Sequence, residues 1–159
     1  MRLPAITTIN RALVLLALPG LIAAAHAQDG ETLVLRDLEP KSPKKLTKEQ
    51  ATELLTGAKI SRVSARGNVH NWTNDAGGSF VASSDNRGAG AVTAGSGRTT
   101  TSPGKWHISD DGRYCVLIEW RGVPSEEWCR FILQTTDGYY AVRSDSVGTE
   151  RVYKLEIKK

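Results

Sequence analysis

The chain has 159 residues, a hydrophobic fraction of 40% and a formal net charge of +4 at pH 7. A chain of this length is typical of one domain, and such a domain can bury about two-thirds of its unfolded surface. The small excess of positive charge is far from the clustered basic face of nucleic-acid-binding proteins, so we expect no nucleic-acid partner.

Residues 1–27 have the features of a secretory signal peptide. Two arginines lie within the first eleven positions, and an apolar run, ALVLLALPGLIAAA, follows over residues 12–25. The tripeptide AHA then fits the small-x-small pattern of a cleavage site. The apolar run is shorter than the roughly 20 residues of a membrane-spanning helix. We therefore expect cleavage between Ala27 and Gln28, a periplasmic or secreted bacterial protein, and no stable membrane span after cleavage.

A flexible lead-in is expected over residues 28–45, because its lysines lie close to Pro40 and Pro43, as in a solvated arm. Cleavage of the signal peptide removes two arginines and no acids. The mature chain then has 19 Lys and Arg against 17 Asp and Glu, which is close to neutral. We expect a single β-rich domain over residues 46–159.

The segment LTKEQATELLTG, residues 46–57, predicts the one helix of the mature chain. Thr47 and Gln50 have the spacing of a capping box, and Gly57 is placed to end the helix. The spacing of three and four along one face predicts an apolar stripe of Ala51, Leu54 and Leu55. A short helix with one apolar stripe has to pack against the rest of the domain.

After the helix, short β-prone segments alternate with turns. The candidate strands are VHNWTN, GSFVASS, a weaker GAGAVTAG at residues 88–95, KWHIS, RYCVLIEW, WCRFILQT, YYAVRS and RVYKLEI. The Asp-Gly pair at 137–138 is a strong hairpin signal. This pattern predicts a mainly β fold: an antiparallel meander forming a small barrel or sandwich, lipocalin-like in outline, with one short N-terminal helix.

Cys115 and Cys129 lie in two neighbouring candidate strands that flank the turn RGVPSE. In an antiparallel hairpin centred on Gly122 they are directly opposed and share a face, so the two sulfurs can meet. An oxidising compartment outside the cytosol favours a disulfide over metal or redox chemistry, and the spacing is far from that of redox or zinc motifs. We expect a disulfide between them and no metal.

Both faces of this hairpin are apolar. One face of the first strand carries Tyr114, Val116, Ile118 and Trp120. The other face carries Cys115 and Leu117, joined by Phe131 and Leu133 of the second strand. A strand of this kind is usually covered on both sides. We expect the barrel or sandwich interior on one side and the helix of residues 46–57 on the other.

Several motifs, NWTNDAGGSF, GKWHISDDGRYCV and EEWCR, occur in this order along the chain. Together with the leading helix they resemble small secreted proteobacterial proteins catalogued only as a domain of unknown function. The resemblance covers residues 46–143. It implies export, the disulfide and β architecture, and it implies no activity or cofactor.

An enzyme is the less favoured interpretation. The mature chain keeps two histidines, His70 and His107, and has several serines and aspartates. No nucleophile motif selects one serine, and triads are recognised by geometry rather than by composition. We assign no catalytic residue and no cofactor, and a hydrolase with an unrecognised site is kept as a second alternative.

The function expected from the sequence is non-catalytic binding of a small amphipathic or sugar-like ligand. Trp120 and Trp128 bracket the stapled turn and can form the rim of a barrel mouth, and Arg121 and Arg130 can hold an anionic group. The alternative is an envelope protein that binds another protein, such as an inhibitor or accessory factor. A cavity lined by tryptophans would favour the first function, and an exposed aromatic patch would favour the second.

Overall fold

The computed structural model describes residues 32–64, 67–85 and 99–159. The expected signal peptide and the weak strand candidate at 88–95 lie outside these residues. The helices are the 3-10 helix η1 (Leu35–Lys41) and the α-helix α1 (Lys48–Leu55). The strands are β1 (Lys44–Lys45), β2 (Lys59–Val63), β3 (Val69–Thr73), β4 (Ser79–Ser84), β5 (Thr100–Ile108), β6 (Tyr114–Ile118), β7 (Glu126–Thr135), β8 (Gly138–Val142) and β9 (Val152–Lys158).

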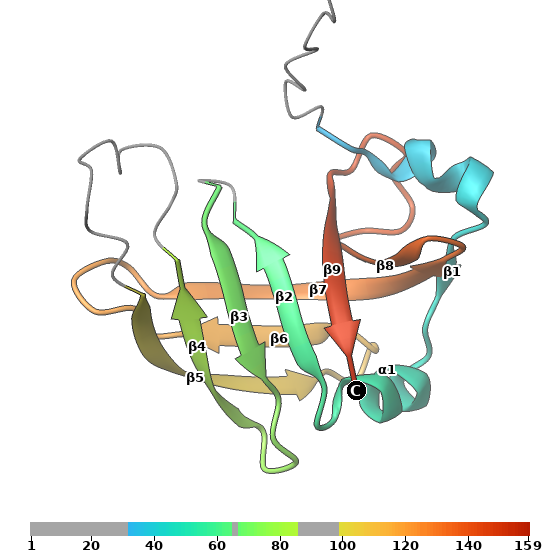
Figure 1. The fold of residues 1–159 in the computed structure, drawn as a ribbon. Helices are drawn as coiled ribbons and strands as arrows, with labels where there is room; N and C mark the ends of the chain where they lie inside the picture. The colour runs from blue at the N-terminus through green and yellow to red at the C-terminus, as the bar shows by residue number, and fades with distance from the viewer. Residues whose placement is uncertain (1–31, 65–66, 86–98) are drawn as a thin grey trace, which may run out of the picture. The chain divides into compact units, whose positions relative to one another are not determined.

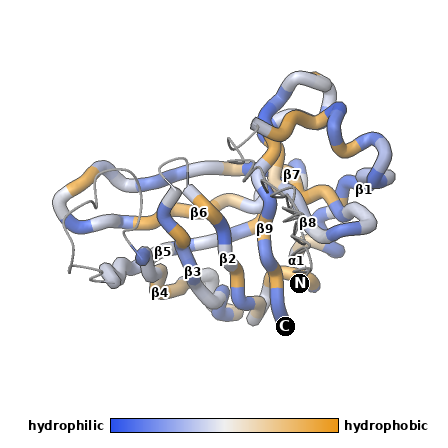
Figure 2. Tube along the Cα trace, turned by 45° about the horizontal axis from the view of Figure 1, so that its top comes forward, coloured by the Kyte–Doolittle hydropathy of each residue, from blue (hydrophilic) through white to orange (hydrophobic). Residues whose placement is uncertain are grey.

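Strands β2 to β9 form a closed antiparallel barrel of eight strands. Each strand pairs with the next one along the chain, and β9 pairs with β2 to close the sheet. In Figure 1, β2, β3 and β9 run across β6 and β7, which form the opposite wall. Hydrophobic and hydrophilic residues alternate along strands such as β9 (Figure 2), as expected when one face points into a core. The prediction of a mainly β antiparallel meander is confirmed, and the sheet forms a barrel.

Strand β7 is shared between two parts of the barrel. Its first half, Glu126–Arg130, pairs with β6, and its second half, Phe131–Thr135, pairs with β8. β1 adds to the other edge of this second half, where Lys45 is opposite Leu133. A stagger of this kind is what a sheet requires in order to close on itself.

One end of the barrel interior is filled by large side chains and covered by α1. Ala51 and Leu55 of α1 belong to the same buried cluster as Trp72 and Trp106. Residues of this cluster come from most strands of the barrel: Ile60, Trp72, Phe80, Ala82, Trp106, Tyr114, Val116, Ile118, Ile132, Ala141 and Leu155. The strand Cβ atoms that point inward at this end therefore form a solid core.

A buried polar network joins α1 to this core. Trp72 Nε1 donates a hydrogen bond to the Tyr114 hydroxyl at 3.0 Å, and that hydroxyl donates to Asn74 Oδ1 at 2.9 Å. Asn74 Nδ2 in turn donates to the Leu55 carbonyl at 3.0 Å, at the last residue of the helix. The network satisfies polar groups that water cannot reach, which is the usual condition for burying them.

Local contacts explain where α1 begins and ends. Thr47 Oγ1 accepts from the Gln50 backbone N–H at 3.2 Å, and Gln50 Oε1 accepts from the Thr47 N–H at 3.0 Å. This reciprocal pair is a capping box. Gly57 follows the helix with φ of +74°, a left-handed conformation that glycine adopts without strain.

Of the segment predicted to be a flexible lead-in, the structure describes residues 32–45. This part forms η1 and β1, and Leu38 of η1 is fully buried. Leu38 packs in a second cluster that lies outside the barrel interior and contains Phe131, Leu133, Tyr140, Val142 and Val152. The lysines and prolines around it remain largely exposed, so composition predicted a solvated arm although a single leucine anchors the segment.

The second cluster also corrects the expected cover of the stapled hairpin. The sequence predicts that the segment of α1 covers the face of the hairpin opposite the interior, without specifying which face that is. In the structure Leu38 of η1 packs on that face, and α1 packs on the barrel interior. The two apolar faces are therefore both covered, but by different elements from those expected.

Two strands of the barrel also differ from the sequence prediction. β2 (Lys59–Val63) was not predicted, because Lys59, Ser61 and Arg62 leave it only two strongly β-prone residues. β5 begins at Thr100, five residues before the predicted KWHIS segment. Within β5, Gly104 faces Phe80, whose ring occupies the space that a side chain at 104 would take.

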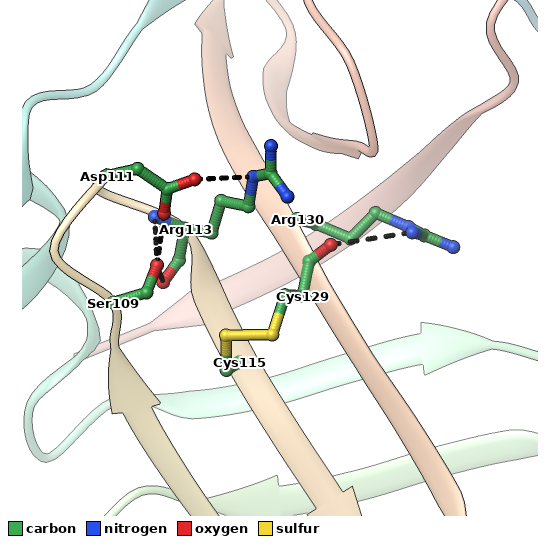
Figure 3. Close-up of a disulfide and its surroundings, with 6 residues drawn as sticks. All are labelled: Ser109, Asp111, Arg113, Cys115, Cys129 and Arg130. Carbon is green, nitrogen blue, oxygen red and sulfur yellow. Dashed lines mark hydrogen bonds and ion pairs between the residues drawn. A yellow bond between two sulfur atoms is a disulfide. The ribbon is translucent and has the colours of Figure 1, made fainter.

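The disulfide between Cys115 and Cys129 is confirmed. The two residues are directly opposed in the β6–β7 register, with Cα atoms 4.0 Å apart. Figure 3 shows the bond joining the two strands, with the side chains of Arg113 and Arg130 above it in this view. The staple lies one residue pair from the end of the β6–β7 ladder that is far from the turn.

Removal of the disulfide should destabilise the barrel without changing its fold. We expect Cys129→Ser to lower the free energy of unfolding by about 2–5 kcal/mol, because the unfolded chain then loses its loop constraint. Urea denaturation of the wild type and the variant measures this difference. The wild-type cysteines should react with a thiol reagent only after reduction, and reaction of the unreduced folded protein would contradict the prediction.

Truncation of the η1 anchor should also lower stability. We expect Leu38→Ala to lower the free energy of unfolding by about 2–5 kcal/mol, as is usual for a fully buried leucine. Glu39→Ala changes the next, exposed residue and serves as the control. If both variants unfold at the same urea concentration as the wild type, η1 does not contribute to the stability of the domain.

Candidate functional site

A cavity of about 1060 Å³ lies at the end of the barrel opposite α1. Its walls come from the strand ends on that side: Arg62 of β2, His70 of β3, Ser102 of β5, Trp128 of β7 and Tyr153 of β9. Its volume is comparable with the upper end of ligand pockets, about 300–1,000 Å³. The aromatic core thus fills one end of the barrel and leaves the other end open to a small molecule.

All four residues that the sequence singled out for ligand binding line this cavity: Trp120, Arg121, Trp128 and Arg130. The two tryptophans are half-buried, whereas Arg121 is exposed. Arg130 lies over the Tyr153 ring, with its guanidinium carbon 5.4 Å from the ring centroid. The other two tryptophans, Trp72 and Trp106, are buried in the core. The role of Trp120, Arg121, Trp128 and Arg130 as ligand-binding residues stays a prediction.

The most buried charge at the cavity, Arg62, was missed by the sequence analysis. Its side chain is 10% exposed, forms an ion pair with Glu126, and lies 5.2 Å from the Trp128 ring centroid. Burial lowers the pKa of Arg62 to about 10, so the guanidinium remains charged at neutral pH. Ile60 and Arg62 are two residues apart and therefore lie on the same face of β2. This spacing could have predicted the buried arginine, because it places a charge on the face that carries a core residue.

His70 lies beside this arginine. Its side chain is 7% exposed, and its ring centroid is 4.9 Å from that of Trp120. Burial and, to a smaller extent, the positive charge of Arg62 lower the pKa of His70 to about 4, although Asp85 opposes this shift. His70 is therefore neutral at pH 7. His107, on β5, is exposed.

Three buried polar atoms at the cavity have no hydrogen-bond partner: Arg62 Nε, His70 Nδ1 and Ser102 Oγ. Among the described residues, Arg113 Nε also has none, but it forms an ion pair with Asp111 at 3.0 Å. Buried polar groups normally find a partner in protein or water. All three belong to residues that line the cavity.

The described residues include no group of three or more His, Cys, Asp or Glu side chains that could hold a metal ion. Their helices are too short to cross a bilayer.

The fold and the site define an up-and-down β-barrel with an internal cavity that contains a buried arginine. A family model described as a protein of unknown function (DUF995) matches residues 26–145. The chain belongs to this family, which confirms the resemblance to a domain of unknown function. No curated protein and no solved structure matches the chain.

The neutral state of His70 predicts a pH-dependent stability. Histidine in an unfolded chain titrates near pH 6.5, and burial and Arg62 hold the folded pKa near 4. Between these values the unfolded state binds more protons, so this contribution to stability is lost as the pH falls.

We expect His70→Gln to reduce the loss of stability between about pH 7 and about pH 4.5, by at most about 1.4 kcal/mol per pH unit. Urea denaturation at each pH measures it, and His107→Gln, an exposed histidine, is the control. Equal pH profiles for the wild type and His70→Gln would contradict the burial of a neutral His70.

Proposed function

We propose that this protein is an exported, non-catalytic binding protein that holds a small amphipathic or sugar-like ligand inside its barrel. The observation that carries the proposal is the cavity of about 1060 Å³ at one end of the barrel, whose lining includes the buried side chains of Arg62, His70 and Ser102. Eight-stranded barrels have an interior wide enough for one small ligand.

The cavity wall combines apolar and polar side chains, as an amphipathic ligand requires. Trp120, Trp128, Tyr153 and Leu155 supply apolar surface. Arg62 already covers one face of the Trp128 ring, so a ligand would contact the remaining surface of the indole. Ligand sites combine a mostly apolar wall with a few placed polar groups, and this lining has both.

Export is part of the same proposal. The signal-peptide pattern of residues 1–27 supports it, and so does the disulfide between Cys115 and Cys129. Disulfides form and persist outside the reducing cytosol.

The alternative of an envelope protein that binds another protein has less support. The large hydrophobic residues that are exposed in the described part of the chain are single valines: Val63, Val81, Val123 and Val147. Scattered exposed hydrophobic residues are normal on a protein surface and do not mark an interface.

Purification from the native host tests the proposal. We expect native mass spectrometry to show a small molecule that stays bound to the folded protein and is released on denaturation. Trp128→Ala should lose most of this molecule, because the variant removes an apolar wall of the cavity. Trp106→Phe, which changes a tryptophan of the filled core, should keep it.

Near-ultraviolet circular dichroism checks that both variants are folded. The proposal is contradicted if the folded wild type carries no small molecule and binds none from a fractionated extract of the same host.

A further inference from the structure

Four nitrogen atoms converge on the carboxylate of Glu126. Trp128 Nε1 donates to Glu126 Oε1 at 3.2 Å, and Trp120 Nε1 donates to Oε2 at 3.5 Å. Arg62 forms its ion pair with Oε1, and His70 Nδ1 lies 3.5 Å from Oε2. The nitrogens come from β2, β3 and the β6–β7 hairpin, so the fold assembles a site for one carboxylate.

The carboxylate is less buried than the arginine and the histidine that face it. The Glu126 side chain is 25% exposed, whereas those of Arg62 and His70 are 10% and 7% exposed. Glu126 is the first residue of β7 and directly follows the β6–β7 turn. Glu126 can therefore exchange its protein partners for water, while Arg62 cannot. A buried arginine that loses its partner requires another anion.

Glu126 leaves several polar atoms of this site without a hydrogen-bond partner. It pairs with Nη2 of Arg62, and Nε of the same guanidinium has no partner. The Nε and Nη2 edge of an arginine is well suited to the two oxygens of a carboxylate. His70 Nδ1, although 3.5 Å from Glu126 Oε2, and Ser102 Oγ also have no hydrogen-bond partner. A carboxylate free of the β7 backbone could reach groups that Glu126 leaves unpaired.

We propose that the cavity binds a small organic carboxylate with an apolar body, and that Glu126 occupies the anion site until the ligand displaces it. This inference rests on the proposed binding function. One buried arginine balances one negative charge, which favours a carboxylate over a phosphate dianion. The apolar body would lie against Ala141, Tyr153 and Leu155, which line the same cavity.

The test uses octanoate and octan-1-ol as matched probes of the carboxylate and the apolar body. Isothermal titration calorimetry at neutral pH measures both against the wild type and Glu126→Gln. We expect Glu126→Gln to bind octanoate about tenfold more tightly than the wild type, because the competing carboxylate is gone. Octan-1-ol should bind the two proteins equally.

The control is Glu119→Gln, which removes the same charge from an exposed position just after β6 that does not line the cavity. Its octanoate affinity should equal that of the wild type. The double variant Arg62→Met with Glu126→Gln should lose the preference for octanoate over octan-1-ol. Glu126→Asp keeps the charge but withdraws it by one methylene, so it should also bind octanoate more tightly and decides the matter if Glu126→Gln does not fold.

The inference is overturned if the folded Glu126 variants bind octanoate no more tightly than the wild type. If octan-1-ol then binds and the native protein carries a small molecule, the proposed binding function stands and only the carboxylate is wrong. If neither probe binds any folded variant and no native ligand is found, both proposals fail.

Discussion

Pairing between β2 and β9 is the constraint on which the rest of this structure depends. It closes the sheet, so no long strand edge of the barrel is left unpaired. It also brings the last strand of the chain beside one of the first, which places Tyr153 and Leu155 in the same cavity wall as Arg62. A closed barrel of eight strands has a fixed internal width. Its interior is therefore either filled by side chains or occupied by one small ligand.

This protein divides its interior between the two outcomes. At the α1 end, Trp72 and Tyr114 join Asn74 in a satisfied polar network within an aromatic core. At the other end, the side chains of Arg62 and Ser102 line open volume, and Arg62 Nε and Ser102 Oγ are buried without a hydrogen-bond partner. The first arrangement contributes stability, and the second is the end of the barrel to which we assign the proposed binding function.

The buried ion pair of Arg62 and Glu126 is better explained by specificity than by stability. Taking two charges out of water is unfavourable, and a well-packed apolar pair in their place is often as stable. Trp120, Trp128 and His70 surround the carboxylate. In the function we propose, this arrangement recognises one kind of anion and accounts for a cavity that pairs a charged end with an apolar wall.

The sequence by itself determined the local features of this protein. The cysteine register follows from a two-residue period centred on Gly122, and Thr47 with Gln50 defines a helix start, because both depend on neighbours in the chain. The residues bracketing the stapled turn could also be placed near one another, and they do line the cavity. Only the tertiary structure decided that Leu38 anchors the lead-in and that Arg62 lies inside the barrel. Those two positions depend on contacts between distant segments, and composition averages over a single buried leucine or arginine in an otherwise polar stretch.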